Sequence, residues 1–226
     1  MPRTIDPILQ TLREMALRMG GLAEAILGKA LRSVFERDAA LAREVAIDDL
    51  EIDRLDLAID EGVLRALALQ APLADDLRKV IAIKMMASDL ERVGDLSRNI
   101  AKSGQRLVAR PLVRPPPQLA GLAEAAQRML RDALDAFAQS DTGRAREVLA
   151  ADDRVDRDQD RVVEMLIGEI GEHPELSAQE VDLILIAENL ERVGDHATNI
   201  AEDVILATEA RNLKHADKLA REAARR

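Results

Sequence analysis

The chain of 226 residues contains no cysteine, no tryptophan and no tyrosine, and it has only two phenylalanines. The lack of cysteine excludes a disulfide framework, a thiolate metal site and a cysteine nucleophile. Because aromatic residues make up only 1% of the chain while hydrophobic residues make up 47%, the core has to be built from aliphatic side chains. This composition is typical of a helix bundle.

The chain is also short of positive charge, with 32 Lys and Arg against 42 Asp and Glu and a formal net charge of -10. An acidic protein is a poor binder of phosphate backbones, so we expect no nucleic-acid partner. The excess of acid favours binding of cations or of basic protein surfaces. The first residues, MPRTIDPILQ, lack the apolar region of a signal peptide, and no run approaches the roughly 18 apolar residues of a membrane span. We therefore expect a cytoplasmic protein without a membrane span.

Proline and helical periodicity divide the chain into two halves of three amphipathic helices each. The three consecutive prolines at 115–117 predict that 110–118 is a stiff linker, because such a run cannot lie inside a helix. Asp141 is a predicted N-cap, and Pro72 and Pro174 mark breaks between helices. The predicted helices cover about 6–36 and 39–69, then a third from after Pro72 to about 108, a fourth at about 119–139, a fifth from the cap at Asp141 to about 170, and a sixth from about 174 to 208. The predicted domains are a first bundle at 1–109, a linker at 110–118, a second bundle at 119–208 and a polar tail at 209–226.

The two halves are duplicates of each other. The string LERVGD occurs at 90–95 and again, 100 residues later, at 190–195. At an offset of 103, the acids Asp49 and Asp53 match Asp152 and Asp156. The sequence therefore predicts an all-α protein of two tandem three-helix bundles related by internal duplication.

Acidic residues line one face of the second predicted helix, beside its apolar stripe. They follow one another at steps of four, three and four, which are the steps that share a helix face: Asp49, Asp53, Asp56 and Asp60. Like charges four residues apart repel by roughly 0.2–0.5 kcal/mol per pair. A helix that places them beside its buried edge needs a compensating cation.

The third predicted helix adds Glu91 and Asp95, also four apart, with Gly94 between them. A glycine inside a helix costs about 1 kcal/mol relative to alanine, so Gly94 and its duplicate Gly194 predict a close approach to the backbone. Consecutive helices of a bundle run antiparallel, and their acidic edges are expected to meet. The candidate metal ligands are Asp49, Asp53, Glu91 and Asp95 in the first half, and Asp152, Asp156, Glu191 and Asp195 in the second.

Clustered carboxylates without thiolate are the chemistry of hard cations, here iron, magnesium or manganese, with zinc also compatible. A solvated acidic face balanced by Lys and Arg is the alternative for any one acidic run, but the recurrence of paired acids in both halves favours metal binding. Asp89 is expected at the surface. Asn199 is expected either behind a metal ligand or in an ordinary bond between helices, and His196 in local packing.

Two long strings, PLADDLRKVIAIKMMASDLERVGD at 72–95 and IAENLERVGDHATNIAE at 186–202, resemble the PhoU family of phosphate-signalling regulators, and the resemblance covers essentially the whole chain. It implies a protein that is not an enzyme and that holds iron, zinc or other divalent or trivalent metal ions on the acidic motifs. It also implies that the protein couples a phosphate ABC transporter, through the ATPase subunit, to a sensor histidine kinase, and negatively regulates the phosphate-starvation response. The first half carries Asp76-Leu77-Arg78 where the second has Leu176-Ser177-Ala178, so the two halves need not be equivalent.

Two other functions and the oligomeric state remain open at this level. One alternative is a carboxylate-bridged di-metal enzyme, but its usual Glu-x-x-His pairs are missing, since the residues three before His173 and His196 are Ile170 and Val193. The other is a helical adaptor that binds no metal. Whether two copies form a homodimer is also left open.

Overall fold

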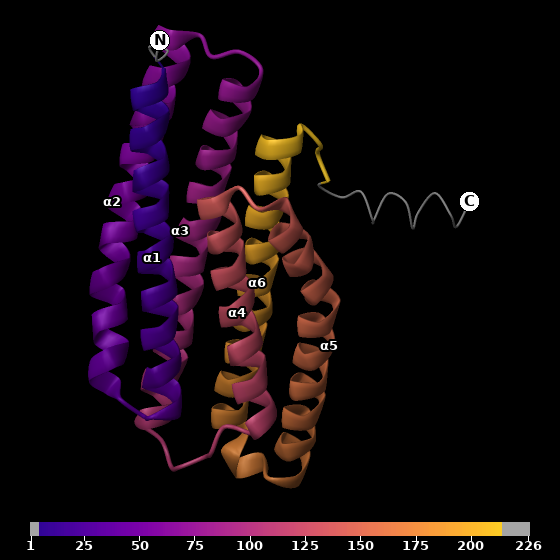
Figure 1. The fold of residues 1–226 in the computed structure, drawn as a ribbon. Helices are drawn as coiled ribbons and strands as arrows, with labels where there is room; N and C mark the ends of the chain where they lie inside the picture. The colour runs from indigo at the N-terminus through magenta and orange to yellow at the C-terminus, as the bar shows by residue number, and fades with distance from the viewer. Residues whose placement is uncertain (1–4, 214–226) are drawn as a thin grey trace.

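The computed structural model describes residues 5–213, and all of its regular structure in that range is helical. Six long helices are joined by short turns and one brief 3-10 turn, η1 (Pro174–Leu176). The helices are α1 (Asp6–Phe35), α2 (Ala39–Gln70), α3 (Asp75–Val108), α4 (Pro117–Gln139), α5 (Thr142–Glu172) and α6 (Ser177–Glu209). The predicted all-α fold of two three-helix bundles is confirmed (Figure 1).

Local signals explain most of the helix boundaries. Asp141 caps α5 as predicted, because its carboxylate accepts hydrogen bonds from the backbone N–H groups of Gly143 and Arg144. Asp38 caps α2 in the same way. The third helix begins after Pro72 as predicted, at Asp75. Two other starts differ by a few residues: Pro117 is the first residue of α4 rather than part of the linker, since a proline is tolerated in the first turn of a helix, and α6 begins at Ser177 after the η1 turn.

Each bundle contributes two helices to the centre of the molecule and one to its outside. Helices α3 and α6 pack along each other, and α1 contacts α4. Helix α2 packs on α1 and α3, while α5 packs on α4 and α6. Figure 1 shows α2 and α5 on opposite outer sides. The acidic helices α2 and α5 therefore each have one long face that no other described helix covers.

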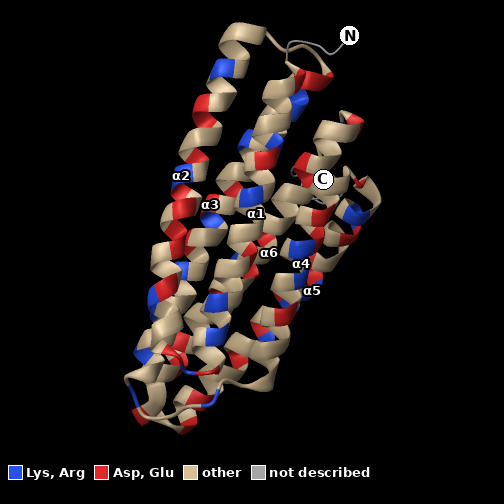
Figure 2. Cartoon of the chain, turned by 60° about the vertical axis from the view of Figure 1, so that its left-hand side comes forward, with Lys and Arg blue, Asp and Glu red and all other residues tan. Residues whose placement is uncertain are grey.

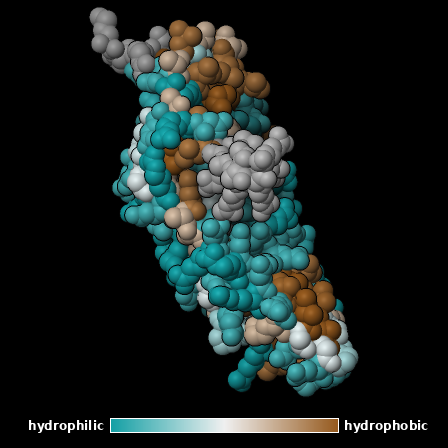
Figure 3. All heavy atoms as spheres, turned by 90° about the vertical axis from the view of Figure 1, so that its right-hand side faces the viewer, coloured by the Kyte–Doolittle hydropathy of each residue, from teal (hydrophilic) through white to brown (hydrophobic). Residues whose placement is uncertain are grey.

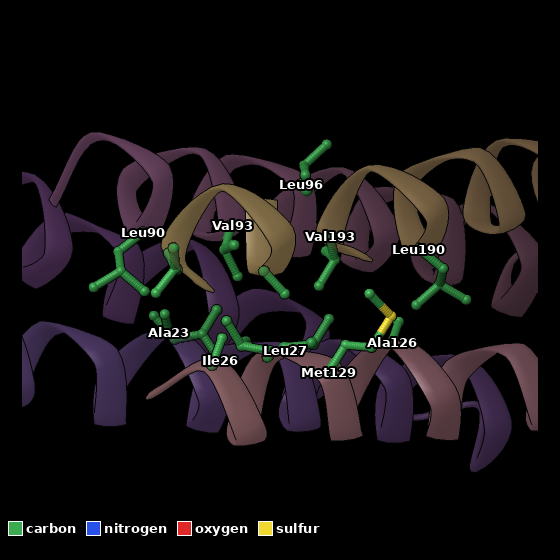
Figure 4. Close-up of a cluster of buried hydrophobic side chains, with 14 of the residues drawn as sticks. Ala23, Ile26, Leu27, Leu90, Val93, Leu96, Ala126, Met129, Leu190 and Val193 are labelled. Atoms are coloured by element: carbon green, nitrogen blue, oxygen red, sulfur yellow. The ribbon is translucent and has the colours of Figure 1, made fainter. Parts of the chain in front are cut away.

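The repeated LERVGD motif supplies the middle of the core. Leu90 and Val93 of α3, and Leu190 and Val193 of α6, are fully buried. Figure 4 shows them beside side chains such as Ile26 of α1 and Met129 of α4. The apolar positions of the motif therefore hold the two halves together, and its acidic positions are left to face the outer helices.

None of the helices in residues 5–213 has a segment that is long and apolar enough to cross a membrane. On the face shown in Figure 3, hydrophilic residues cover much of the middle, and hydrophobic ones gather toward both ends. The greater part of the polar tail predicted for 209–226 lies outside the described residues.

Candidate functional site

The acids predicted on α2 and α3 are brought together where the two helices pack. Asp49 is 1% exposed, and its carboxylate lies directly against Gly94 of α3. Burial raises the pKa of Asp49, the nearby Arg98 lowers it, and the negative charges of Asp53 and Asp95 raise it further. The pKa of Glu91 is also raised, first by burial and then by Asp95. Because Asp53 and Asp95 raise the pKa of both Asp49 and Glu91, the four carboxylates lie in one region, as their spacing in the sequence predicts.

An arginine already lies among the carboxylates of the first half. Arg98, one turn beyond Asp95 on α3, donates from Nη1 to Asp49 Oδ2 at 2.6 Å and from Nη2 to Asp95 Oδ1 at 2.5 Å. This guanidinium joins the two helices through charge-assisted bonds, which are among the stronger hydrogen bonds in proteins. The cation that the acidic face of α2 requires is, at this point, supplied by the chain itself.

Lys84 of α3 supplies a second internal cation. Its ammonium group forms ion pairs with Asp56, at 3.3 Å, and with Asp60. Hydrogen bonds to these two acids raise the pKa of Lys84 against the opposing effect of burial. Of the acidic stripe on α2, the two later aspartates therefore share one cation from α3, and the two earlier ones belong to the candidate site.

The second half presents the same carboxylates without the arginine. Asp152 and Asp156 of α5 lie near Glu191 and Asp195 of α6. This proximity is evident because the negative charges of Asp156 and Asp195 raise the pKa of Asp152, and those of the three aspartates raise the pKa of Glu191. Burial, with the neighbouring negative charges, raises the pKa of Asp152 to about 6 and that of Glu191 to about 7. The pKa values of Asp156 and Asp195 are raised as well, chiefly by burial. Asp152 and Glu191 are half-buried, whereas Asp156 and Asp195 are exposed, so ionisation is disfavoured chiefly at the first two carboxylates.

The difference between the halves comes from residues beside the repeated motif. At the offset of 100, Arg98 is replaced by Thr198, and Lys102 by Glu202. The Thr198 hydroxyl donates to the backbone carbonyl of Asp195 at 2.6 Å and carries no charge. The same face of α6 has therefore lost two positive charges and gained a negative one, and Glu202 adds to the rise in the pKa of Asp152. This difference can be found in the sequence when the positions at which the two halves differ are compared as well as those at which they agree.

Both glycines of the repeated motif allow the outer helix to approach, as predicted, but with different neighbours. A Cβ added at Gly94 would lie 2.5 Å from Asp49 Oδ1 and 3.2 Å from Ile52 Cδ1. A Cβ at Gly194 would lie 3.3 Å from Val155 Cγ1. The first contact is shorter than real Cβ contacts, so Gly94 is required for the position of the Asp49 carboxylate, whereas Gly194 mainly allows close packing of α5 on α6.

The carboxylates of the two clusters differ in how well they fit a metal ion. As the side chains stand, no three acidic or histidine residues within 5–213 converge closely enough to hold a metal. Asp152 Oδ1 is nevertheless buried and accepts no hydrogen bond from that part of the chain. A buried carboxylate oxygen without a donor, among three further carboxylates, is chemically suited to a cation. The second cluster fits a hard metal ion better than the first, where Arg98 is already bonded.

The expectation for Asp89 was wrong, because this side chain is not at the surface but is 13% exposed between the two halves. Asp89 Oδ1 lies 2.7 Å from His196 Nδ1 of α6 and accepts a hydrogen bond from Asn199 Nδ2 at 3.0 Å. Asn199 therefore makes the ordinary inter-helix bond that was one of its two predicted roles, and His196 pairs with α3. These three residues hold the halves together next to the second cluster.

Comparison with known proteins agrees with the duplicated bundle. A family model described as the PhoU domain matches residues 16–104 and matches again at 119–204. The phosphate-specific transport system accessory protein PhoU homolog of Zymomonas mobilis is 36% identical over 211 residues, which are 93% of this chain and 89% of that protein. The homolog from Pseudomonas putida is 34% identical over 92% of this chain and 81% of its own length.

Solved structures of the family have the same fold. The crystal structure of PhoU from Pseudomonas aeruginosa superposes with a TM-score of 0.89 at 33% identity, covering 92% of this chain and 100% of that one. The crystal structure of the phosphate transport system regulatory protein PhoU from Streptococcus pneumoniae gives a TM-score of 0.85 at 29% identity, covering 92% and 99% of the two chains. With two domain matches and relatives above 30% identity along most of its length, the chain belongs to the PhoU family.

Proposed function

We propose that this protein is a metal-binding regulator of phosphate transport, and that its principal cation site is the second cluster, Asp152, Asp156, Glu191 and Asp195. The single observation that carries the site is that Thr198 stands where the first half has Arg98, while Asp152 Oδ1 is shielded from solvent and accepts no hydrogen bond within residues 5–213. A carboxylate oxygen held away from water among other carboxylates is unfavourable unless a positive charge joins it. A bound divalent cation would offset part of the negative charge of the cluster and fix the spacing of α5 and α6.

The first cluster, Asp49, Asp53, Glu91 and Asp95, is proposed as a weaker site. For a metal ion to use Asp49 and Asp95 there, Arg98 has to leave two short hydrogen bonds. Breaking a charge-assisted pair in which Asp49 is almost fully buried is costly, so the apparent affinity for a cation is reduced. The two halves would then differ in metal affinity although their acidic motifs match.

The regulatory part of the proposal is supported by the family. Relatives are named as accessory or regulatory proteins of a phosphate transport system. We extend this role to the present chain as a cytoplasmic, non-enzymatic protein that associates with the ATPase subunit of a phosphate transporter. Coupling to a sensor histidine kinase, and repression of the phosphate-starvation response, complete the proposed role. The long uncovered faces of α2 and α5 offer surface for such partners.

The test compares matched double variants of the two clusters. Purified wild type, Asp152→Asn with Asp195→Asn, and Asp49→Asn with Asp95→Asn are stripped with a chelator, reloaded with Mn²⁺ or Zn²⁺ and measured for bound metal. Each variant also replaces the wild type in cells carrying a phosphate-starvation reporter. We expect the second-half variant to lose the tighter-binding metal and to derepress the reporter, with a smaller effect from the first-half variant. Unchanged metal content in the second-half variant would refute the site, and unchanged repression would refute its regulatory role.

A further inference from the structure

A pocket lies at one end of the contact between the two halves, where α1 and α3 begin and α4 and α6 end. Its volume is about 520 Å³, which is within the range of small-molecule sites. Each of the four helices contributes an apolar side chain to the lining: Leu9, Ile83, Phe137 and Val204. Charged residues stand beside them, and Figure 2 shows acidic and basic residues together at this end of the molecule, near the mark for the N-terminus. This composition is usual for a site that takes a small organic molecule.

The internal duplication shows that the opposite end of the molecule is closed by the chain itself. There Arg37, in the turn between α1 and α2, donates from Nη2 to the carbonyl oxygen of Leu107 at 2.9 Å and to that of Val108 at 3.3 Å. These are the last two residues of α3, and the final carbonyls of a helix have no partner within the helix. The guanidinium of Arg37 is therefore the cap of α3.

The pocket is open because the equivalent residues of the second half are short. Ser140 occupies the position of Arg37, 103 residues later. The two have φ angles of 54° and 55°, and each directly precedes the aspartate that caps the next helix. Ser140 lines the pocket, and a serine side chain cannot span the distance that an arginine does. Ala82 also lines it, where its counterpart at the closed end, Asp182, is buried and paired with two arginines.

The end of α6 lies at this pocket without a cation of its own. Ala207 and Thr208, the counterparts of the two residues that Arg37 caps, line the pocket, and α6 has no basic residue in its last turn. The last carbonyls of a helix carry a partial negative charge that favours a cation. The end of α4 differs, because Arg13 donates to the carbonyl oxygen of Ala138 there. Of the two helices that end at the pocket, α6 is the one that lacks a guanidinium.

We propose that the pocket binds a small organic cation, a guanidinium or ammonium group on an aliphatic stem, in the place that Arg37 fills in the first half. The cation donates hydrogen bonds to the carbonyl oxygens at the end of α6, and the stem packs against the apolar wall. Asp6 and Asp75 also line the pocket and favour a positive charge. Lys79 opposes it, but this side chain is exposed and is therefore screened by water.

Isothermal titration of the full chain in EDTA with N-butylguanidinium tests the proposal. N-butylurea is the matched probe, because it has nearly the same shape and no charge. We expect saturable binding of one butylguanidinium per chain with a Kd on the order of 0.1 to 1 mM, and binding of the urea at least about tenfold weaker. The carboxylate clusters also attract cations, so Asp152→Asn with Asp195→Asn is the control, and it is expected to bind butylguanidinium as the wild type does.

Three results of this titration would overturn the proposal. They are the absence of saturable binding to the wild type, equal binding of the urea, and loss of binding in the Asp152→Asn, Asp195→Asn variant, which would place the cation at the second cluster.

Exchanging the residues at the two equivalent turns tests the cause of the opening. Ser140→Arg is expected to close the pocket, so that butylguanidinium binds at least about tenfold more weakly and the midpoint of thermal unfolding rises by about 2 to 4 °C. Arg37→Ser is expected to lower the midpoint by a similar amount. Ser140→Met, of similar length but without N–H donors, is expected to leave the midpoint unchanged. The proposal fails when Ser140→Arg binds like the wild type, when neither arginine exchange moves the midpoint, or when Ser140→Met raises it as much as Ser140→Arg.

Discussion

Replacing Thr198 by arginine is expected to give the second cluster the internal cation of the first. The backbones of α3 and α6 carry the same motif, so Thr198→Arg puts a guanidinium one turn beyond Asp195, where Arg98 stands relative to Asp95. An opposite charge within bonding reach lowers a carboxylate pKa by about 1 to 3 units. The pKa of Asp152, raised to about 6 in the wild type, is therefore expected to move back toward its ordinary value.

The size of the effect on metal binding follows from Coulomb's law. A guanidinium about 5 Å from a divalent ion costs roughly 1.7 kcal/mol even with the dielectric constant of water, and more in a partly buried site. Affinity for Mn²⁺ is therefore expected to fall at least about tenfold. Conversely, the metal-free variant is expected to be more stable than the wild type at neutral pH by roughly 1 to 2 kcal/mol, since one pKa unit corresponds to 1.36 kcal/mol.

Isothermal titration with Mn²⁺ measures the first quantity, and urea unfolding in EDTA measures the second. Thr198→Gln is the matched control, because it adds length without charge. Arg98→Thr, the reverse exchange, is expected to strengthen metal binding in the first half. Undiminished Mn²⁺ affinity in Thr198→Arg would refute the reasoning, and so would an equal loss in Thr198→Gln, which would indicate crowding rather than charge.

Three further outcomes follow from the same structure. The pKa values of Asp152 and Glu191 are raised to about 6 and about 7, above those of the unfolded chain. These two groups therefore stabilise the metal-free protein most below about pH 4, where they are protonated in both states. With allowance for the partial exposure of both side chains, the unfolding free energy of the metal-free protein is expected to fall by roughly 2 to 3 kcal/mol between about pH 4 and 7. Urea titrations measure this fall, and saturating metal is expected to remove it. Gly94→Ala is expected to lower the free energy of unfolding by roughly 1 to 2 kcal/mol, because the added Cβ meets the Asp49 carboxylate, which Arg98 holds in place. Gly194→Ala is expected to be neutral or stabilising by up to about 1 kcal/mol, and thermal unfolding of the two variants distinguishes these outcomes. Asp182→Ala is expected to cost roughly 2 kcal/mol in urea unfolding, since this 4% exposed carboxylate pairs with Arg106 of α3 and with Arg110 just beyond the end of that helix. An unchanged midpoint would show that these pairs contribute nothing.

Much of the fold could be predicted from the chain alone because its information is local and repeated. The period of 3.6 residues placed the helices, Asp141 marked the start of α5, and the two copies of LERVGD established the duplication. The same periodicity put the candidate carboxylates on helix edges that face each other. The clearest errors of boundary were the helix starts near Pro117 and Pro174, where proline is compatible with both a turn and a first helical residue.

The sequence by itself determined the helices, the repeat and the set of carboxylates that share each half. Only the tertiary structure decided which of those carboxylates are already neutralised, because that depends on how far one helix is rotated and shifted against another. Asp49 and Arg98 are 49 residues apart, and Asp89 and His196 are 107 apart, so no local pattern relates them. The first cluster is closed by its own arginine, and the second is left with a buried carboxylate oxygen that has no donor in residues 5–213. The exchange of Arg98 for Thr198 is visible in the sequence, but only the packing of α3 on α2 shows that Arg98 reaches the buried Asp49.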